Sequence, residues 1–419
     1  MRELKGCRAC AAANPEIVFS LGEQSLSGFL LPDQSPRYGP LDLVLCRQCG
    51  LVQLGHTYPG DWLYTWYGYR SGTNAMMVAA LRELAAEVMI RAPLAPGDGV
   101  CDVGSNDGTF LRNFADAGIR KIGFDPAKNL GPIACEGLDL WVNDYFSAGA
   151  LGPEVLQHGP MRAVTALAMF YQLHNPVEFL NDVRRVLHPE GLLAIQMNYL
   201  PSMLERNGYD NIVHEHQTYF SLTTLLPVLR AGGFEAIDAS VNDINGGSFL
   251  IWCAPKGHHR KIDGDNLVRL IKYEAAMDLR AADTYVYFGR RLRQLRHELR
   301  GVIVQLVSEG KRVYVYGAST RGLTIMEYCQ FNHALIAGAA ERNPDKWGRA
   351  YGATGIPCVP EDEARAKADY FLVLPHHFLS SFVEREAEWL NDGGQFIVPL
   401  PRVRLIARGG VEVEALRVR

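Results

Sequence analysis

The sequence predicts an α/β protein with a Rossmann-like core, a small metal-binding domain before it and a second Rossmann-like α/β domain after it. Two CxxC units stand near the N-terminus, and strand–glycine loop–helix patterns follow at 97–118 and 311–329. A chain of 419 residues is too long for one ordinary hydrophobic core, so several domains are expected. The expected boundaries are 1–72, 73–260, a helical connector at 261–310, and 311–419.

Composition and charge narrow the classes of partner. The formal net charge is −4, so no broad basic field is present and nucleic acid is not an expected partner. The sequence contains no apolar run of about 18 residues, so no membrane span is expected, and the N-terminal MRELKGCRAC lacks the apolar stretch of a signal peptide. We therefore expect a cytoplasmic monomer or homodimer that acts on a small molecule.

The two CxxC units are Cys7-Arg-Ala-Cys10 and Cys46-Arg-Gln-Cys49. Each suits a tight knuckle in which two thiolates face one ion, and two knuckles make the closed tetrahedral site typical of structural zinc. The alternative is a redox CxxC, which is expected as a single motif near a βαβ unit. A closed site of four thiolates leaves no open coordination position, so we assign it no catalytic role.

The first glycine loop is DVGSNDG, which follows a strand expected at Val100–Val103 and precedes a helix expected from Thr109. It matches neither GxGxxG nor a Walker motif, which argues against a dinucleotide or ATP. The motif resembles the glycine loop of S-adenosylmethionine (SAM) sites, where this loop holds the methionine part of the cofactor. The alternative is a Rossmann-like fold that uses these glycines only for turns. The loop residues expected to bind SAM are Asp102, Gly104, Ser105, Asn106, Asp107 and Gly108.

Further strand ends complete the expected cofactor site. KIGFDP ends in Asp125, about twenty residues beyond the glycine turn, where a carboxylate can accept hydrogen bonds from ribose hydroxyls. VNDYF supplies groups for the adenine, and AVTALAMFYQL and LLAIQMNYL read as the fourth and fifth strands of a doubly wound sheet. The additional residues expected to contact SAM are Pro126, Asn143, Asp144, Tyr145, Ala168, Met169 and Phe170.

The second glycine loop, Gly317–Gly322, opens a helix in the C-terminal part of the chain. Helix N-termini suit anions, and Ser319, Thr320 and Arg321 could offer two hydroxyls and a charge to a phosphate. Recognition of a nucleotide-sugar phosphate and a purely architectural domain both remain open from these residues alone.

Several motifs in this order resemble one family along essentially the whole chain. They are CRAC/CRQC, YGYRSGTN, DVGSNDG, FYQL, NYLPSMLERNGYDNIVHEHQTYFSL, NGGS, YGASTRG and ERNPDKWG. The family is that of the three-domain C-methyltransferases that act on nucleotide-linked deoxysugars, such as TDP-ketosugar C-3-methyltransferases. The resemblance implies structural zinc in the first domain, SAM in the middle one and a nucleotide sugar held with help from the last.

The sequence departs from the family at two positions. Val213 stands before the HEH triplet, where the characterised sugar enzymes carry tyrosine. The FYQLHNP segment has no clean match to the family's active-site histidine, which Gln172 replaces without a gap and His174 with a small shift. These two residues and Asn198 are expected to contact the substrate. The departures leave open which sugar is the substrate, and whether the enzyme methylates an acidic carbon of a different class of substrate.

C-methylation of a ketosugar needs a base that removes a proton beside the carbonyl, and a donor that stabilises the enolate oxygen. By analogy with the family, His216 is the expected base, Glu215 holds a substrate hydroxyl or an imidazole tautomer, and His214 belongs to the same catalytic segment but is more structural. In an extended loop His214 and His216 would face one side and Glu215 the other. The alternatives are a loop capped only through backbone bonds and a metal site that lacks a convincing third ligand.

The WYGYRSGTN segment is the second catalytic constellation. By its position in the family pattern, Tyr69 is the phenol expected at the enolate oxygen or near the sulfonium, while Tyr67, Ser71 and Asn74 are expected to contact SAM from the lid side. Simple packing of aromatic side chains between domains is the alternative. The competing functions are O- or N-methylation, C-methylation of a non-sugar, and a non-catalytic zinc-knuckle binding protein.

Overall fold

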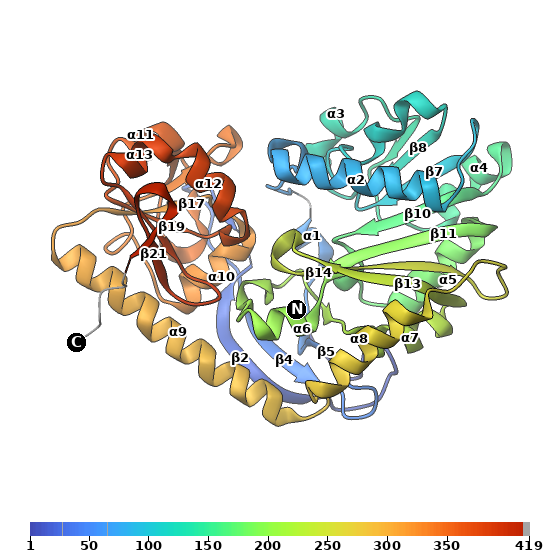
Figure 1. Ribbon diagram of the computed structural model, residues 1–419, viewed down its shortest axis with the longest axis horizontal. Helices are drawn as coiled ribbons and strands as arrows, with labels where there is room; N and C mark the ends of the chain where they lie inside the picture. Colours follow the sequence, from blue (N-terminus) through green and yellow to red (C-terminus); the bar gives the residue numbers. More distant parts are fainter. Residues whose placement is uncertain (27, 65, 414–419) are drawn as a thin grey trace.

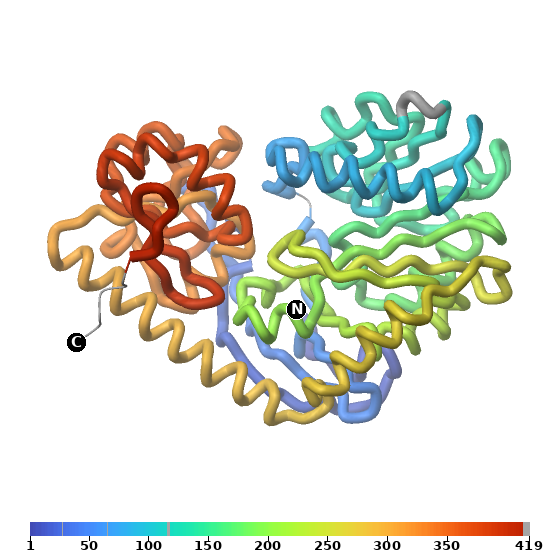
Figure 2. Tube along the Cα trace, viewed as in Figure 1, coloured from blue at the N-terminus to red at the C-terminus, as the bar shows by residue number. Residues whose placement is uncertain are grey.

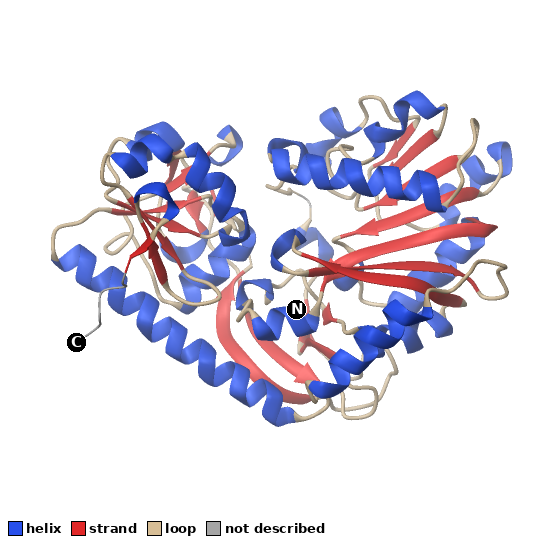
Figure 3. Cartoon of the chain, in the orientation of Figure 1, coloured by secondary structure: helices blue, strands red, loops and turns tan. Residues whose placement is uncertain are grey.

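The computed structural model describes residues 1–26, 28–64 and 66–413, and its strands form two separate lobes joined by a third layer (Figure 1). Each lobe contains a seven-stranded sheet, and a four-stranded sheet lies below and between them (Figure 3). In the described residues no helix is both long and apolar enough to cross a membrane.

The sheet of the first lobe is parallel except for one reversed strand, β14, which pairs antiparallel with both of its neighbours. The chain order reverses between β7 and β10, which creates the crevice where doubly wound sheets bind ligands. The Rossmann-like prediction for this part is confirmed. In sheet order the strands are β13 (Phe234–Asn242), β14 (Ser248–Pro255), β11 (Leu187–Asn198), β10 (Met161–Leu167), β7 (Gly99–Val103), β8 (Arg120–Phe124) and β9 (Leu140–Val142).

Helices cover both faces of this sheet, and their ends follow local capping chemistry. The long helix predicted after YRSGTN is α2 (Ala75–Arg91), where the Asn74 side chain accepts hydrogen bonds from the first free backbone N–H groups. The predicted fourth strand is shorter than expected, because a 3-10 turn at Phe170–Gln172 follows β10. The other helices of this lobe are α3 (Gly131–Ala134), α4 (Ala148–His158), α5 (Pro176–Val186), α6 (Leu200–Glu205) and α7 (Leu222–Ala231).

The second lobe repeats the same plan in a smaller form, with a sheet that is parallel from β18 to β20, ends in antiparallel β21 and β22, and reverses order between β15 and β19. The four strands predicted here from sequence are present as β15, β16, β19 and β20. In sheet order the strands are β18 (Cys358–Pro360), β16 (Ala339–Glu341), β15 (Val313–Tyr316), β19 (Tyr370–Val373), β20 (Gln395–Val398), β21 (Arg404–Ile406) and β22 (Glu412–Val413). Its helices are α10 (Thr320–Tyr328), α11 (Glu361–Arg365), α12 (Leu379–Arg385) and α13 (Ala387–Asn391).

The N-terminal segment builds the layer beneath the lobes, and Figure 2 traces it in blue from the middle of the molecule. Its sheet takes its last strand from the first lobe, more than 160 residues further along the chain. In order the strands are β12 (Thr218–Tyr219), β5 (Val52–Leu54), β4 (Tyr38–Leu45) and β2 (Glu16–Ser25). The sequence analysis did not predict the long β2–β4 ribbon. Two short antiparallel pairs join β1 (Arg2–Glu3) to β6 (His56–Thr57), and β3 (Phe29–Leu30) to β17 (Ala350–Tyr351). Helix α1 (Gly60–Leu63) follows β6 in the chain.

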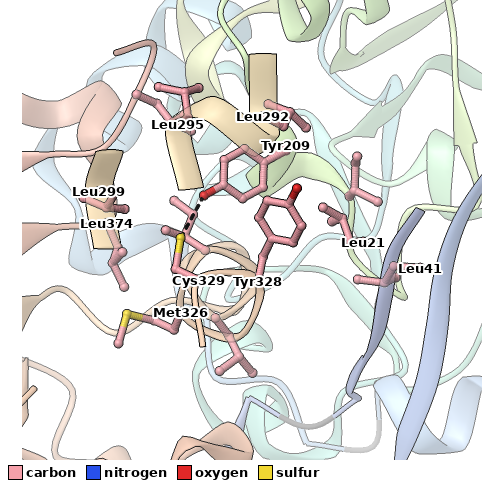
Figure 4. Packing of buried hydrophobic residues seen from close by; sticks show 14 of the residues in the cluster. Leu21, Leu41, Tyr209, Leu292, Leu295, Leu299, Met326, Tyr328, Cys329 and Leu374 are labelled. Atoms are coloured by element: carbon pink, nitrogen blue, oxygen red, sulfur yellow. Dashed lines mark hydrogen bonds between the residues drawn. The ribbon is translucent and has the colours of Figure 1, made fainter. Parts of the chain in front are cut away.

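Two helices, α8 (Gly264–Ala276) and α9 (Ala282–Ser308), fall in the range predicted as a connector. Helix α9 runs from the bottom centre of the molecule along the underside of the second lobe and packs on β2, where the Phe19 and Phe288 rings meet edge to face. The largest apolar cluster therefore draws on the N-terminal ribbon, α9 and the second lobe. Figure 4 shows Tyr209 of the first lobe reaching into this cluster, with its hydroxyl 3.7 Å from the Cys329 sulfur.

Candidate active site

One large cavity, of about 1220 Å³, opens between the two lobes. The glycine loop of the first lobe lines one end of it, and the glycine loop of the second lobe lines the other. The cover segment, which we define as residues 67–74, and the HEH loop, residues 213–217, contribute further lining residues between these ends. The structure therefore brings the main motifs of the sequence to one place.

The four cysteines form a compact cluster away from this cavity. The Cys7 and Cys49 sulfurs are 3.6 Å apart, as are those of Cys10 and Cys46, and all four lie within 4.8 Å of one another. Four sulfurs at about 2.3 Å from one tetrahedral zinc ion would stand about 3.8 Å apart, so the cluster fits that ion. The Gln53 side chain also donates to the Cys7 sulfur, the kind of outer contact that orients a metal ligand.

Two buried carboxylates stand at the strand ends of the first glycine loop. Asp102 accepts a hydrogen bond from the Thr165 hydroxyl at 2.5 Å, and burial raises its pKa to about 7. Asp125 accepts from the backbone N–H groups of Asn106 and Ala127, both at 2.9 Å. Neither carboxylate has an ion-pair partner within the described ranges, so a cationic ligand such as a sulfonium or an ammonium group fits beside them.

The glycine loop itself requires glycine at its first turn. Gly104 has φ +73°, and an added Cβ would lie 3.0 Å from the Cβ of Met169. The following residues fasten the cover segment: Asn106 accepts from the Ser71 N–H and donates to the Tyr69 carbonyl, and Asp107 accepts from the Gly72 N–H. Asp107, which was predicted to bind the cofactor, does not line the cavity, because its carboxylate holds this segment.

The HEH loop is a tight turn, since the His216 N–H donates to the Val213 carbonyl at 3.0 Å. This turn places Glu215 and His216 together on the cavity and sends His214 away, where its Nε2 donates to the Gly39 carbonyl. The expectation that His214 and His216 face the same side is therefore wrong, because it assumed an extended loop.

His216 is held in one tautomer. Its Nδ1 lies 2.7 Å from the Asn211 carbonyl oxygen, which can only accept, so Nδ1 carries the hydrogen and Nε2 keeps its lone pair. Burial, followed by the positive charge of Arg321, lowers the pKa of His216 to about 3, so the ring is neutral near pH 7. Burial also raises the pKa of the Glu215 carboxyl to about 7, although the Tyr67 hydroxyl donates to it at 3.4 Å.

Two basic side chains on the side of the second lobe, Arg321 and Lys346, are already paired. Arg321 donates to Asp210 at 2.5 Å and to the Asn245 carbonyl at 2.6 Å, which links this lobe to the first. Lys346 donates to Glu341 at 2.9 Å. Ser319 and Thr320 line the cavity, and the Ser319 side chain also caps α10.

Comparisons with known proteins agree with this arrangement. Three family models match along the chain: a zinc binding domain at 7–64, a methyltransferase domain at 77–239 and a C-methyltransferase C-terminal domain at 243–401. The C-methyltransferase NovU of Streptomyces niveus is 32% identical over 413 residues, which covers 97% of this chain and 98% of that protein. The chain belongs to the C-methyltransferase family. It is a SAM-dependent methyltransferase with a zinc-binding N-terminal part.

Solved structures match less than half of this C-methyltransferase. PH0226 protein from Pyrococcus horikoshii OT3 has a TM-score of 0.36 at 15% identity and covers 45% of this chain and 95% of that chain. Magnesium protoporphyrin IX methyltransferase (ChlM) from Synechocystis PCC 6803, solved with SAH, has a TM-score of 0.34 at 14% identity, with 44% and 88% covered.

Most of the predicted site residues of this C-methyltransferase meet at the cavity. Five lie outside its lining: Gly108 behind the glycine loop, Asn143 bonded to the Asp125 carbonyl, Phe170 in the core, and Asp107 and His214 as above. Their predicted contacts with ligands therefore lack support. The predicted residues in the lining are Tyr67, Tyr69, Ser71, Asn74, Asp102, Gly104, Ser105, Asn106, Asp125, Pro126, Asp144, Tyr145, Ala168, Met169, Gln172, His174, Asn198, Glu215, His216, Ser319, Thr320 and Arg321.

Sequence reasoning missed Tyr171 of this C-methyltransferase. Its ring lies edge-on to His216 with centroids 4.2 Å apart, and the only hydrogen bond found at this residue among the described residues is to its backbone carbonyl. Burial raises the pKa of this phenol, so it remains a neutral donor that lines the cavity. In the FYQL motif the sequence analysis assigned a substrate contact to Gln172. No sequence signal distinguishes Tyr171 from an ordinary aromatic residue of the core.

Proposed function

We propose that this enzyme transfers a methyl group from SAM to a carbon of a nucleotide-linked ketosugar. One observation carries the proposal: a single cavity joins the glycine loop of the first lobe, the neutral imidazole of His216 and the glycine loop of the second lobe. A substrate that extends from the HEH loop to the glycine loop of the second lobe needs a reactive end beside His216 and a polar end beside Ser319 and Thr320. A nucleotide sugar has this shape.

The first lobe would hold the cofactor. Asp125 would accept from the ribose hydroxyls, and Asp102 would favour the cationic part through its buried carboxylate. Tyr145, which is half exposed at the cavity, would lie against the adenine. The bound cofactor supplies an electrophilic methyl group to a carbanion on the substrate.

His216 would remove the proton from the carbon beside the carbonyl. Its free Nε2 is the atom that would accept this proton, and its Nδ1–H bond to Asn211 would keep the ring in place. A ring with a pKa near 3 is a weak base, so an enolate formed beside it would have to stabilise the imidazolium. Glu215 has a pKa near 7 and faces the same cavity, so we propose that it exchanges protons with a substrate hydroxyl.

Two phenols would stabilise the enolate oxygen. Tyr69 was expected there from sequence, and it lines the cavity at an exposed position. Tyr171 lies against His216 and lines the cavity, so it would replace the phenol that is absent at Val213. Donors aimed at a developing oxyanion contribute about 10²–10³-fold in rate, which makes these hydroxyls as important as the base.

Ligand binding tests the substrate class first. TDP, UDP and GDP should be compared by thermal shift in the presence of S-adenosylhomocysteine, with the matching nucleosides as controls. A stabilisation by one diphosphate, and a much smaller effect of its nucleoside, supports a nucleotide sugar. If none of the three shifts the melting temperature at millimolar concentration, the non-sugar alternative replaces this proposal.

Solvent exchange tests the reaction class. A TDP-linked 4-keto-6-deoxyhexose incubated in D₂O with the enzyme should exchange one carbon-bound proton in a manner that depends on His216. O- or N-methylation requires no such exchange. Methyl transfer to the sugar without exchange of any carbon-bound proton would refute the enolate mechanism and favour that alternative.

A further inference from the structure

Arg8 stands inside the first CxxC knuckle, between two of the cysteines that fit zinc. Its guanidinium donates to the Leu54 carbonyl at 2.7 Å and to the Thr57 hydroxyl at 2.8 Å, both in the N-terminal layer. The same nitrogen that reaches Thr57 also donates to Gln217 Oε1 at 2.8 Å. One side chain of the knuckle thus contacts the HEH loop, more than 200 residues further along the chain.

Gln217 is the last residue of the HEH loop, and its contact with Arg8 holds the loop to the N-terminal layer. It is fully buried, it follows His216 directly, and its Nε2 donates to the His214 carbonyl at 2.8 Å. Because its Oε1 accepts from Arg8, the amide has one fixed orientation. The Gln217 carbonyl also accepts from the Leu54 N–H at 3.0 Å. Both its side chain and its backbone are therefore held by the N-terminal layer.

The strand that follows the HEH loop belongs to the same layer. Thr218 and Tyr219 form β12, which pairs antiparallel with Gln53 and Val52 of β5. The Gln53 side chain in turn donates to the Cys7 sulfur and accepts from the Arg8 N–H. The HEH loop is therefore fixed at one end by the hydrogen bond of His216 to the Asn211 carbonyl in the first lobe, and at the other end by the N-terminal layer.

We propose that Arg8 is a positioning residue, through which the zinc knuckle sets the place of Glu215 and His216 at the cavity. This inference rests on the proposed roles of these two residues. Cys7 and Cys10, which would hold the metal, would fix the backbone of Arg8 between them, and Arg8 holds Gln217. Zinc then contributes to the reaction by geometry alone, because its four thiolates leave no position for a substrate.

Small displacements of the base have large consequences for the rate. A shift of about 1 Å at a reacting group can cost 10²-fold in turnover. Loss of the Arg8–Gln217 contact should therefore lower kcat and leave the KM for SAM unchanged, because the cofactor site lies on other loops. A role confined to folding would change the melting temperature and the zinc content instead.

The chain offers a matched pair of variants that tests this. Gln217→Met and Thr57→Val each remove one acceptor of the same Arg8 nitrogen, but only the first acceptor belongs to the HEH loop. Gln217→Glu keeps an acceptor for Arg8 and serves as the conservative variant. The full-length, zinc-loaded proteins should be compared for zinc content, kcat with the TDP-linked ketosugar, KM for SAM, and amide hydrogen exchange of residues 211–220.

Gln217→Met should exchange the 211–220 amides at least tenfold faster and lose at least tenfold in kcat, with one zinc per chain and the KM for SAM within twofold. Thr57→Val should match the wild type in both measurements within twofold, and Gln217→Glu should lie nearer to the wild type than to Gln217→Met. Equal effects of Gln217→Met and Thr57→Val, or wild-type exchange in Gln217→Met, would overturn the proposal. If the wild type does not turn over the ketosugar, the proposed function fails, while the exchange data still decide the role of Arg8.

Discussion

The two lobes of this enzyme share one plan but present different chemistry to the cavity between them. In each, a glycine turn after the first strand faces a loop after the fourth: Gly104 lies against Met169, and Gly317 lies against Pro375. Both glycines have φ near +75°. The acidic residues that follow the second strands differ, since Asp125 has no ion pair among the described residues and Glu341 is paired with Lys346.

This difference shows how one fold can serve two kinds of ligand. Among the described residues of the first lobe, Asp102 and Asp125 are buried at the cavity without an ion-pair partner, which favours a ligand that carries positive charge or hydroxyl donors. At the other end of the cavity, Lys346 pairs with Glu341 within the second lobe, and Arg321 pairs with Asp210 of the first lobe. The cavity lining from this lobe includes the hydroxyls of Ser319 and Thr320 and the side chain of Arg342, and such groups suit a polar or anionic ligand.

The largest expected effect separates the lobes by chemistry. His216→Asn should lower kcat by about 10²–10⁴-fold, the usual contribution of a general base, and should leave the SAM Kd within a few-fold. His377 lines the same cavity from the second lobe, so His377→Asn is the matched control. It should keep kcat within about threefold. Steady-state methyl transfer and calorimetric SAM binding measure both, and near-full activity of His216→Asn would remove this residue from the base role.

The sequence identified the parts of the site that depend on local pattern. Both glycine loops, the cysteine pairs and Asp125 are recognisable because each needs particular residue types at short spacing. The direction of His214 was wrong because the HEH turn depends on pairing with β5, which stands far away in sequence. The ion pair of Asp210 with Arg321 was not predicted for the same reason, because the two residues are far apart in sequence and no local motif around either one indicates its partner.

The second prediction contrasts two buried aspartates through pH. The pKa of Asp102 is raised to about 7 by burial, from about 3.9 in the unfolded chain. Between pH 4 and 7 the folded state therefore holds a proton that the unfolded state has lost, so stability falls as pH rises across this window, by at most about 4 kcal/mol. Burial alone would raise the pKa of Asp210, but Arg321 and neighbouring histidines lower it far below its usual range. Its contribution is therefore constant above pH 4.

Thermal unfolding at pH 4.5, 6 and 7.5 measures this contrast. No histidine contributes to the pKa shift of Asp102, so the difference between Asp102→Asn and the wild type reports this carboxyl alone. Asp102→Asn should gain melting temperature relative to the wild type as pH rises, whereas the deficit of Asp210→Asn should be independent of pH. Parallel curves for Asp102→Asn and the wild type would show that this carboxyl titrates normally in the folded protein.

The third prediction uses the two equivalent glycines. Gly104→Ala and Gly317→Ala each force a side chain into a left-handed turn, at a cost of about 1–2 kcal/mol plus the displacement of Met169 or Pro375. The two variants should lose similar stability in thermal unfolding. Only Gly104→Ala should weaken SAM binding in calorimetry, because its Cβ narrows the cofactor loop. Equal loss of SAM affinity in Gly317→Ala would mean that the second lobe also contacts the cofactor.

The smallest expected effect tests the acidic residues after the second strands. Asp125→Asn keeps an oxygen for one of the backbone N–H bonds but loses the charge and one acceptor for the ribose, so the SAM Kd should rise about tenfold, or about 1.4 kcal/mol. Glu341→Gln makes the same change in the second lobe, where Lys346 rather than a ligand holds the carboxylate. Its SAM Kd should stay within twofold. Calorimetry on both variants at pH 8 decides the matter, and the comparison between the lobes fails if Glu341→Gln weakens SAM as much as Asp125→Asn does.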